Sequence, residues 1–190
     1  MKGVNIFLAD GFEDVEALAT NDVLRRGGVR TRLISISGEP FVQSSHGVTV
    51  SAEEMLQDID SDHDGTCAED IMVFPGGMPG STNLAQCGRL IEMMNAHYAA
   101  GGSLAAICAA PGLVLSQLDG IEGKKFTCFE GFQDALIAKG CEYLTEPAVR
   151  CGRIVTGRSA GHAVSFALEI LKLLKDEQTV RSVHHAMYLY

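Results

Sequence analysis

The sequence lacks the features that place a protein in a membrane, in a secretory route or on nucleic acid. No apolar stretch of the 190 residues is long enough to span a bilayer, and the apolar run that follows Lys2 ends at Asp10, too early for a signal-peptide core. Lys and Arg number 15 against 24 Asp and Glu, a net charge of −9, and the basic residues form no stripe. This charge pattern argues against nucleic acid and anionic membranes as partners. We therefore expect a cytoplasmic protein.

The sequence also lacks the Cys and His spacings of a metal site or a disulfide scaffold. Its six cysteines contain no C-x-x-C pair, and the adjacent His184 and His185 have no ligand partners at zinc spacing. We expect free thiols, no metal and no cofactor. No linker, repeat or low-complexity stretch divides the chain, so residues 1–190 are predicted to form one domain.

Strand and helix patterns alternate along the chain. Strands are predicted at 4–9, 30–36, 71–74, 103–107, 125–128 and 153–156, a small hairpin joins 41–42 to 48–50, residues 51–64 hold a short helix and an acidic loop, and longer helices are predicted at 14–26, 83–100, 109–117, 132–139, 161–174 and 178–189. Such alternation favours an α/β protein with a mostly parallel sheet covered by helices on both faces.

Cys108 lies between an apolar strand at 103–107 and a helix with Pro111 in its first turn. A residue on such a strained elbow is lifted from the carboxyl edge of the sheet, where α/β folds bind ligands. The positive end of the helix would favour the thiolate, and the N–H of Ala109 could stabilise an oxyanion. Cys108 is therefore a candidate nucleophile. The alternative is a small buried hydrophobic residue, the role of most free cysteines.

Gly76 and Gly77 follow the strand at 71–74. Their N–H groups can approach a bound oxyanion closely because no side chain intervenes. The alternative is that the glycines only start the next helix.

Four segments together resemble the ThiJ/PfpI superfamily, in particular the branch of the parkinsonism-associated protein deglycase. Their order and spacing match across nearly the whole chain, and they are Leu8–Glu16 (LADGFEDVE), Phe74–Gly77 (FPGG), Ala105–Pro111 (AAICAAP) and Thr156–Gly161 (TGRSAG). The resemblance implies a flavodoxin-like three-layer sandwich, usually a homodimer, in which Cys108 is the reactive group. Apolar residues on the first helix and the hairpin add support for a dimer.

The same resemblance implies roles around the thiol. Glu16 matches a buried glutamate that contacts the cysteine, and burial would raise its pKa so that it can donate a hydrogen bond and pass a proton. We therefore expect its carboxyl within hydrogen-bond reach of the sulfur, whereas Glu13 and Asp14 are expected to point to solvent. Gly77 and Ala109 are implied to supply N–H groups. The alternative for Glu16 is a solvent-facing residue on the first helix.

The sequence departs from the family pattern near this site. Cys128 stands where many relatives carry a histidine, and it is either a resolving thiol for an oxidised Cys108 or a core residue. His46 falls where relatives carry a basic residue on the partner-facing hairpin, and it is either a proton-transfer group or an exposed turn residue. The intracellular-protease branch has histidine directly after its cysteine, where this chain has Ala109. No triad for peptide hydrolysis is visible.

Three functions follow from the resemblance. The first is a glyoxalase or deglycase that uses Cys108 and Glu16 on small aldehydes such as methylglyoxal or on their protein adducts. The second is a redox-responsive stress protein or chaperone that senses oxidants through Cys108. The third, a cysteine peptidase or amidotransferase, lacks the required histidine.

Overall fold

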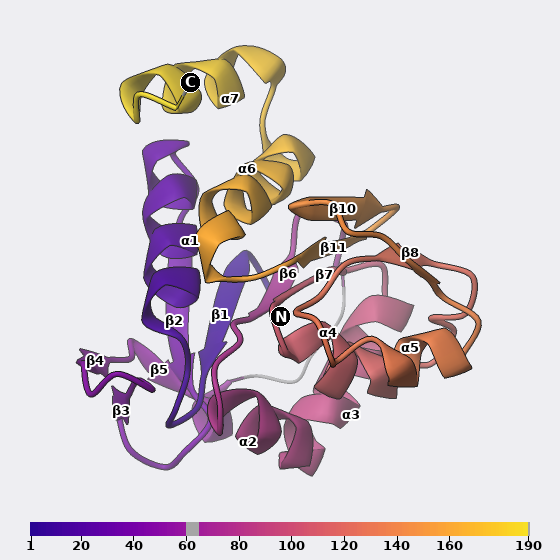
Figure 1. Cartoon of the computed structure of the whole chain (residues 1–190). Coiled ribbons are helices and arrows are strands. Elements are labelled where there is room, and N and C mark those ends of the chain that lie inside the picture. The colour runs from indigo at the N-terminus through magenta and orange to yellow at the C-terminus, as the bar shows by residue number, and fades with distance from the viewer. Residues whose placement is uncertain (60–64, 190) are drawn as a thin grey trace.

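A seven-stranded sheet runs through the centre of the protein, as the computed structural model shows for residues 1–59 and 65–189 (Figure 1). Its strands, in spatial order, are β10 (Ala148–Cys151), β11 (Ile154–Gly157), β7 (Ser103–Ile107), β6 (Ile71–Phe74), β1 (Val4–Leu8), β2 (Thr31–Ser35) and β5 (Glu54–Met55). All neighbouring pairs are parallel except β10 with β11. The mostly parallel sheet confirms the predicted fold class.

Helices cover both faces of this sheet (Figure 1). One face carries α1 (Asp14–Arg26), α6 (Ala163–Leu174) and α7 (Glu177–Ala186), and the other carries α2 (Gly80–Gln86), α3 (Gly88–Ala99), α4 (Ala110–Leu113) and α5 (Asp134–Ala138). Side chains of β1 alternate between the two cores, so that Ile6 packs toward α1 and α6 while Phe7 packs toward the other layer. The arrangement is the flavodoxin-like sandwich that the resemblance implies.

Two small sheets lie outside the main one. β3 (Phe41–Gln43) and β4 (Thr49–Ser51) form the predicted antiparallel hairpin. β8 (Lys125–Phe126) pairs in parallel with β9 (Glu142–Tyr143), so the strand predicted at 125–128 is shorter than expected and lies outside the main sheet.

Several predicted boundaries are wrong for identifiable reasons. The helix predicted at 83–100 is two helices, because Cys87 takes an extended backbone conformation and Gly88, a poor helix former, follows it. The helix predicted at 109–117 ends as α4 at Leu113, and a 3-10 turn, η2 (Leu115–Gln117), follows. Strand β10 was not predicted, since its residues are only partly buried and show little alternation.

Other predictions hold in part. The short helix expected within 51–64 is a 3-10 turn, η1 (Leu56–Asp58), preceded by β5; the rest of that expected acidic loop, residues 60–64, lies outside the described residues. The helix predicted at 161–174 begins as a separate 3-10 turn, η3 (Ala160–His162), before α6. Among the described residues, no helix is long and apolar enough to cross a membrane.

The carboxyl ends of β1, β6, β7 and β11 meet at one edge of the sheet. Neighbouring strands of a parallel sheet end at the same edge, so four loops far apart in sequence converge there: 9–13, 75–79, 108–109 and 158–161. All four sequence segments that carry the family resemblance reach this edge.

Candidate active site

Cys108 occupies a strained elbow between β7 and α4. Its φ is 65°, in the left-handed region that costs a non-glycine residue about 1–3 kcal/mol. The surrounding structure holds this conformation, because the Cys108 N–H donates to Gly157 O (3.0 Å) and the Cys108 carbonyl accepts from the N–H of Phe129 (2.8 Å). The predicted strand-to-helix turn is confirmed. The elbow is fixed from both sides, by the end of β11 and by the segment after β8.

Three groups surround the Cys108 sulfur. The N–H groups of Ala109 and Gly77 donate to it, and the Glu16 side chain, on the first turn of α1, hydrogen-bonds with the thiol. Glu16 is almost fully buried, as the resemblance implies and in contrast to the solvent-facing alternative. The structure thus brings together residues of the loops that follow β1, β6 and β7.

Glycine is required at two positions beside the thiol. A Cβ atom on Gly76 would lie 2.5 Å from both Cys108 Cβ and Glu16 Oε2. Gly77 has a φ of 90°, and a Cβ there would lie 2.4 Å from Glu13 N. The Gly76 N–H donates to Glu16 Oε2 (2.7 Å), so it holds the carboxyl and does not itself approach the sulfur. Only Gly77 of this pair directs an N–H toward the sulfur.

Burial raises the pKa of Glu16 to about 7. Oε1 is buried and has no nitrogen or oxygen donor among the described residues, which leaves one side of the carboxylate poorly solvated. Hydrogen bonds from the thiol and from the Gly76 N–H favour the ionised form and oppose the shift, whereas the nearby charge of Glu13 adds to it. Glu16 is therefore poised to exchange a proton near neutral pH.

The thiol itself does not ionise easily. Burial, together with the charge and hydrogen bond of Glu16, raises the pKa of Cys108 to about 12, and the N–H groups of Ala109 and Gly77 only partly oppose this. The expectation of a thiolate favoured by the helix end is wrong. The reason is that burial of the thiol and the carboxylate against the sulfur outweigh the N–H groups at the start of α4. A thiol of this kind needs a base before it can act as a nucleophile, and the Glu16 carboxyl is the acidic group beside it.

A cavity of about 440 Å³ opens over the thiol. Its lining comes from the four converging loops and from the segment after β8, and it consists of Glu13, Glu16, Gly77, Met78, Cys108, Ala109, Phe129, Phe132, Ser159, Ala160 and Gly161. Of the residues singled out in the sequence, Cys108, Glu16, Gly77 and Ala109 line this cavity. The sequence reasoning missed Phe129, although it directly follows Cys128, at the position flagged as departing from the family.

Glu13 and Asp14 do not simply point to solvent. Glu13 lines the cavity, and its Oε2 accepts the Glu16 N–H (2.7 Å) as the N-cap of α1. Asp14 accepts hydrogen bonds from Ser44 Oγ and from His46 Nδ1 (2.7 Å), which join α1 to the hairpin. The expectation for both residues is therefore wrong.

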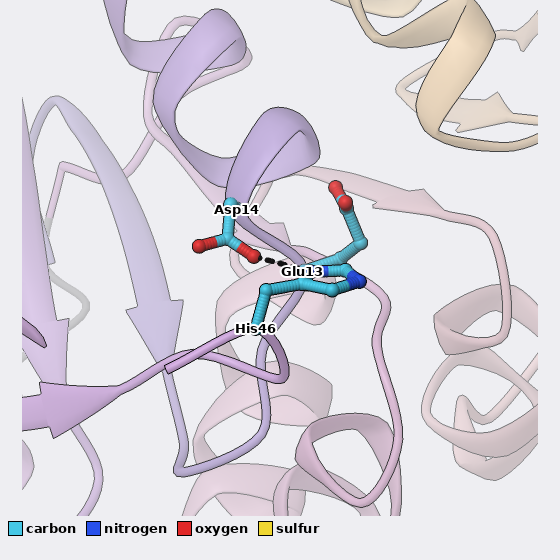
Figure 2. A group of neighbouring side chains, drawn as sticks. All are labelled: Glu13, Asp14 and His46. Carbon is cyan, nitrogen blue, oxygen red and sulfur yellow. Dashed lines mark hydrogen bonds and ion pairs between the residues drawn. The ribbon is translucent and has the colours of Figure 1, made fainter. Parts of the chain in front are cut away.

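His46 is an exposed residue on the hairpin turn and does not line the cavity. Figure 2 shows its ring joined to Asp14. This hydrogen bond raises the pKa of His46. Glu13, Asp14 and His46 place three possible metal ligand atoms within 4.8 Å of one another. Asp14 and Glu13 already accept the hydrogen bonds described above, so the group acts as a link between the hairpin and α1.

Cys128 is fully buried and packs in the core on the α2 to α5 side of the sheet. Burial raises its pKa to about 12. It does not line the cavity, whereas the next residue, Phe129, does. This placement matches the core-residue alternative for Cys128.

Comparisons with known proteins find relatives over nearly the whole chain. Residues 2–173 match the sequence profile of the DJ-1/PfpI family. The chain is 34% identical to DJ-1 homolog A of Arabidopsis thaliana over 99% of its own length and 47% of the relative, and 32% identical to a glutathione-independent glyoxalase of Caenorhabditis elegans over 90% of its length and 87% of the relative. It thus spans about half the length of the Arabidopsis relative.

Solved structures share the fold. A DJ-1 superfamily protein of Salmonella typhimurium superposes with a TM-score of 0.87 at 30% identity, covering 99% of this chain and 98% of the other. Oxidised DJ-1 of Toxoplasma gondii superposes with a TM-score of 0.89 at 27% identity, covering all of both chains.

The pH dependence of Cys108 alkylation tests the coupling between the thiol and Glu16. We expect the rate with the neutral reagent iodoacetamide to rise through a step near pH 7 in the wild type, because above the pKa of Glu16 its carboxylate can accept the thiol proton. Glu16→Gln should remove this step. Glu13→Gln should keep the step but move it to lower pH, since the Glu13 charge raises the pKa of Glu16. Peptide mass spectrometry at timed intervals gives the rates, and an unchanged profile in Glu16→Gln would refute the coupling.

Proposed function

The chain belongs to the DJ-1/PfpI family, and we propose that it is a glyoxalase or deglycase acting on reactive aldehydes such as methylglyoxal or their protein adducts. One observation carries the proposal: a cysteine on a strained elbow and a buried carboxyl with a pKa near 7 share a hydrogen bond, and both residues line an open cavity. A relative that covers most of this chain is named as a glutathione-independent glyoxalase, which supports the reaction class.

The first step forms a hemithioacetal. Cys108 Sγ attacks the aldehyde carbon of methylglyoxal while its proton passes to the Glu16 carboxylate. A C–S bond forms, the carbonyl π bond opens, and the new alkoxide takes the proton back from Glu16. The N–H groups of Gly77 and Ala109 stabilise the negative charge that develops on sulfur or oxygen during this step.

The second step moves hydrogen within the bound substrate. Glu16 removes the hydrogen on the former aldehyde carbon as a proton and returns it to the ketone oxygen, which gives an enediol. The carbon that bore the ketone then gains a proton while the hydroxyl on the sulfur-bearing carbon loses one, which leaves a lactoyl thioester on Cys108. Water hydrolyses the thioester, releases lactate and restores the thiol. The aldehyde carbon is oxidised and the ketone carbon is reduced, so the sum is methylglyoxal plus water to lactate with no external electron donor.

Lactate formation from methylglyoxal tests this function. Cys108→Ser should reduce the rate to that of the uncatalysed reaction, and Glu16→Gln should lower kcat by about 10²–10⁴-fold, the usual contribution of a general base. Cys87→Ser is the matched control, because Cys87 is a partly buried thiol that does not line the cavity. Full activity in Cys108→Ser would exclude the proposed nucleophile.

A second candidate function is oxidant sensing by Cys108, alone or within a chaperone. The supporting observation is that two N–H groups and a carboxyl able to be protonated at neutral pH surround the sulfur, as a sulfinate would require. Oxidation of the thiol by two equivalents of hydrogen peroxide gives sulfinic acid and two water molecules. A peptidase or amidotransferase is disfavoured, since no histidine is among the described residues that line the cavity.

Mild peroxide treatment tests the sensor. We expect Cys108 to gain two oxygen atoms while Cys128 stays reduced, because Cys128 is buried outside the cavity. Peptide mapping by mass spectrometry separates these products. A Cys108–Cys128 disulfide would instead make Cys128 a resolving thiol.

We also propose that the chain forms a homodimer through α1 and the hairpin. Val15, Phe41 and Val48 are large exposed apolar residues of these two elements, and hydrogen bonds from Ser44 and His46 to Asp14 hold the hairpin against the helix. A surface of this kind is suited to a self-complementary interface.

Sedimentation tests the dimer. The wild type should sediment at about twice 20.3 kDa at micromolar concentration, and Val15→Glu should shift it toward the monomer because the interface would bury a charge. Ile137→Glu places the same charge on an equally exposed residue of α5 and serves as the control. A wild-type mass near 20.3 kDa would refute the proposal.

A further inference from the structure

The cavity over Cys108 is larger and more apolar than a three-carbon substrate requires. Its volume of about 440 Å³ lies in the range of about 300–1,000 Å³ found for sites that hold drug-sized ligands. Met78 and Phe129 line it although they remain 50% and 47% exposed. Large apolar side chains at the opening of a pocket indicate contact with an apolar part of a ligand.

Phe129 and Phe132 form the aromatic wall of the cavity, and backbone hydrogen bonds join this wall to the elbow that carries the thiol. Phe129 donates its N–H to the Cys108 carbonyl, and its own carbonyl accepts from the N–H of Phe132 (3.1 Å). The two rings pack edge to face with centroids 6.4 Å apart. Gly112 permits this close approach, because a Cβ there would lie 1.9 Å from the Phe132 carbonyl oxygen. Phe129 is therefore positioned in advance next to the reacting sulfur.

The charge of the cavity excludes anions. Glu13 and Glu16 are its charged or chargeable lining residues, and no Lys, Arg or His is found among the described residues that line it. Arg158, which precedes the lining residue Ser159, is not part of the lining, and its guanidinium donates to the Thr145 carbonyl. A carboxylate on the substrate would meet Glu13 without a compensating cation.

We propose that this pocket selects carbonyl compounds that carry an uncharged aromatic group close to the reacting carbon. We further propose that Phe129 and Phe132 determine this specificity. Stacking on a fixed ring favours a planar aromatic substituent, while Glu13 disfavours a carboxylate of the same size. The choice of a carbonyl substrate rests on the glyoxalase or deglycase function proposed above. The shape and charge preference is a property of the cavity that can be measured without turnover.

Alkylation of Cys108 by two α-haloketones measures the shape preference. Phenacyl bromide and bromoacetone both form a C–S bond with loss of bromide and of the thiol proton, and they differ only in a phenyl or a methyl group. We divide the rate with phenacyl bromide by the rate with bromoacetone, first for Cys108 and then for glutathione. The ratio for Cys108 should exceed the ratio for glutathione about three- to tenfold in the wild type, and the quotient of the two is the normalised ratio. A normalised ratio of one would overturn the proposal.

Variants assign the preference to the aromatic wall. Phe129→Ala should bring the normalised ratio close to one, and Phe129→Leu, which keeps an apolar side chain, should lower it as well because the ring is lost. Ile137→Ala, on a residue that is also 47% exposed but lies outside the cavity, should leave the ratio unchanged. Thermal unfolding verifies that each variant is folded, and a wild-type ratio in folded Phe129→Leu would refute the role of Phe129.

The charge preference has its own pair of reagents. Iodoacetate should react with Cys108 more slowly than the neutral iodoacetamide does. The ratio of the iodoacetamide rate to the iodoacetate rate should be larger for Cys108 than for glutathione, and Glu13→Gln should lower the ratio for Cys108. Equal ratios for Cys108 and glutathione would refute the exclusion of anions.

Turnover separates this inference from the function on which it rests. If phenylglyoxal is converted to mandelate with a higher kcat/KM than methylglyoxal is converted to lactate, both proposals gain support. If neither compound is converted while the alkylation preference is present, the glyoxalase function fails and the selectivity of the cavity stands. If both are converted equally and the alkylation ratio is one, the selectivity fails and the function stands.

Discussion

The hydrogen bond between the Cys108 thiol and the buried Glu16 carboxyl is the constraint on which the site depends. It joins the elbow after β7 to the first turn of α1, and the Gly76 N–H, after β6, holds the same carboxyl from another loop. The carboxyl ends of three adjacent strands therefore have to be level with one another at the edge of the sheet for the thiol and the carboxyl to meet. The parallel register of β1, β6 and β7 provides this alignment.

The protonation states of the two groups depend on each other. Above the pKa of Glu16 the pair carries one negative charge, and in the proposed mechanism that charge moves from oxygen to sulfur when the thiol proton is transferred. A thiol is oxidised or alkylated more slowly than a thiolate, because the thiolate is the nucleophile. The site therefore combines a thiol that reacts slowly at rest with a carboxyl that lies against it.

Local sequence patterns predict the scaffold better than they predict the chemistry. The apolar run at 103–107 and Pro111 identify the elbow, because strand burial and the first turn of a helix leave local signals. The pKa of Cys108 has no such signal, since it depends on burial and on a carboxyl 92 positions earlier in the sequence. The contact with Glu16 was available only through the family resemblance.

The residues that sequence reasoning missed share a physical cause. Phe129 and Phe132 come from an irregular segment with no periodic pattern, and their approach to the cavity depends on space left by Gly112 on a different element. From the sequence, Glu13 is expected to face solvent. Its role as the N-cap of α1 depends on where that helix starts relative to the loop after β6, which the sequence does not indicate. Placement of this kind arises from tertiary packing and not from local propensity.

The aromatic wall of the cavity and the thiol–carboxyl pair come from different parts of the fold. The charge pair is built by loops of the main sheet, whereas the aromatic residues lie between β8 and β9, outside that sheet. The Phe129 N–H nevertheless holds the Cys108 carbonyl, so the backbone of this outer segment is part of the support of the elbow. The backbone of the wall is therefore constrained by the elbow, whereas the side chains at 129 and 132 can change the shape of the cavity without loss of that hydrogen bond.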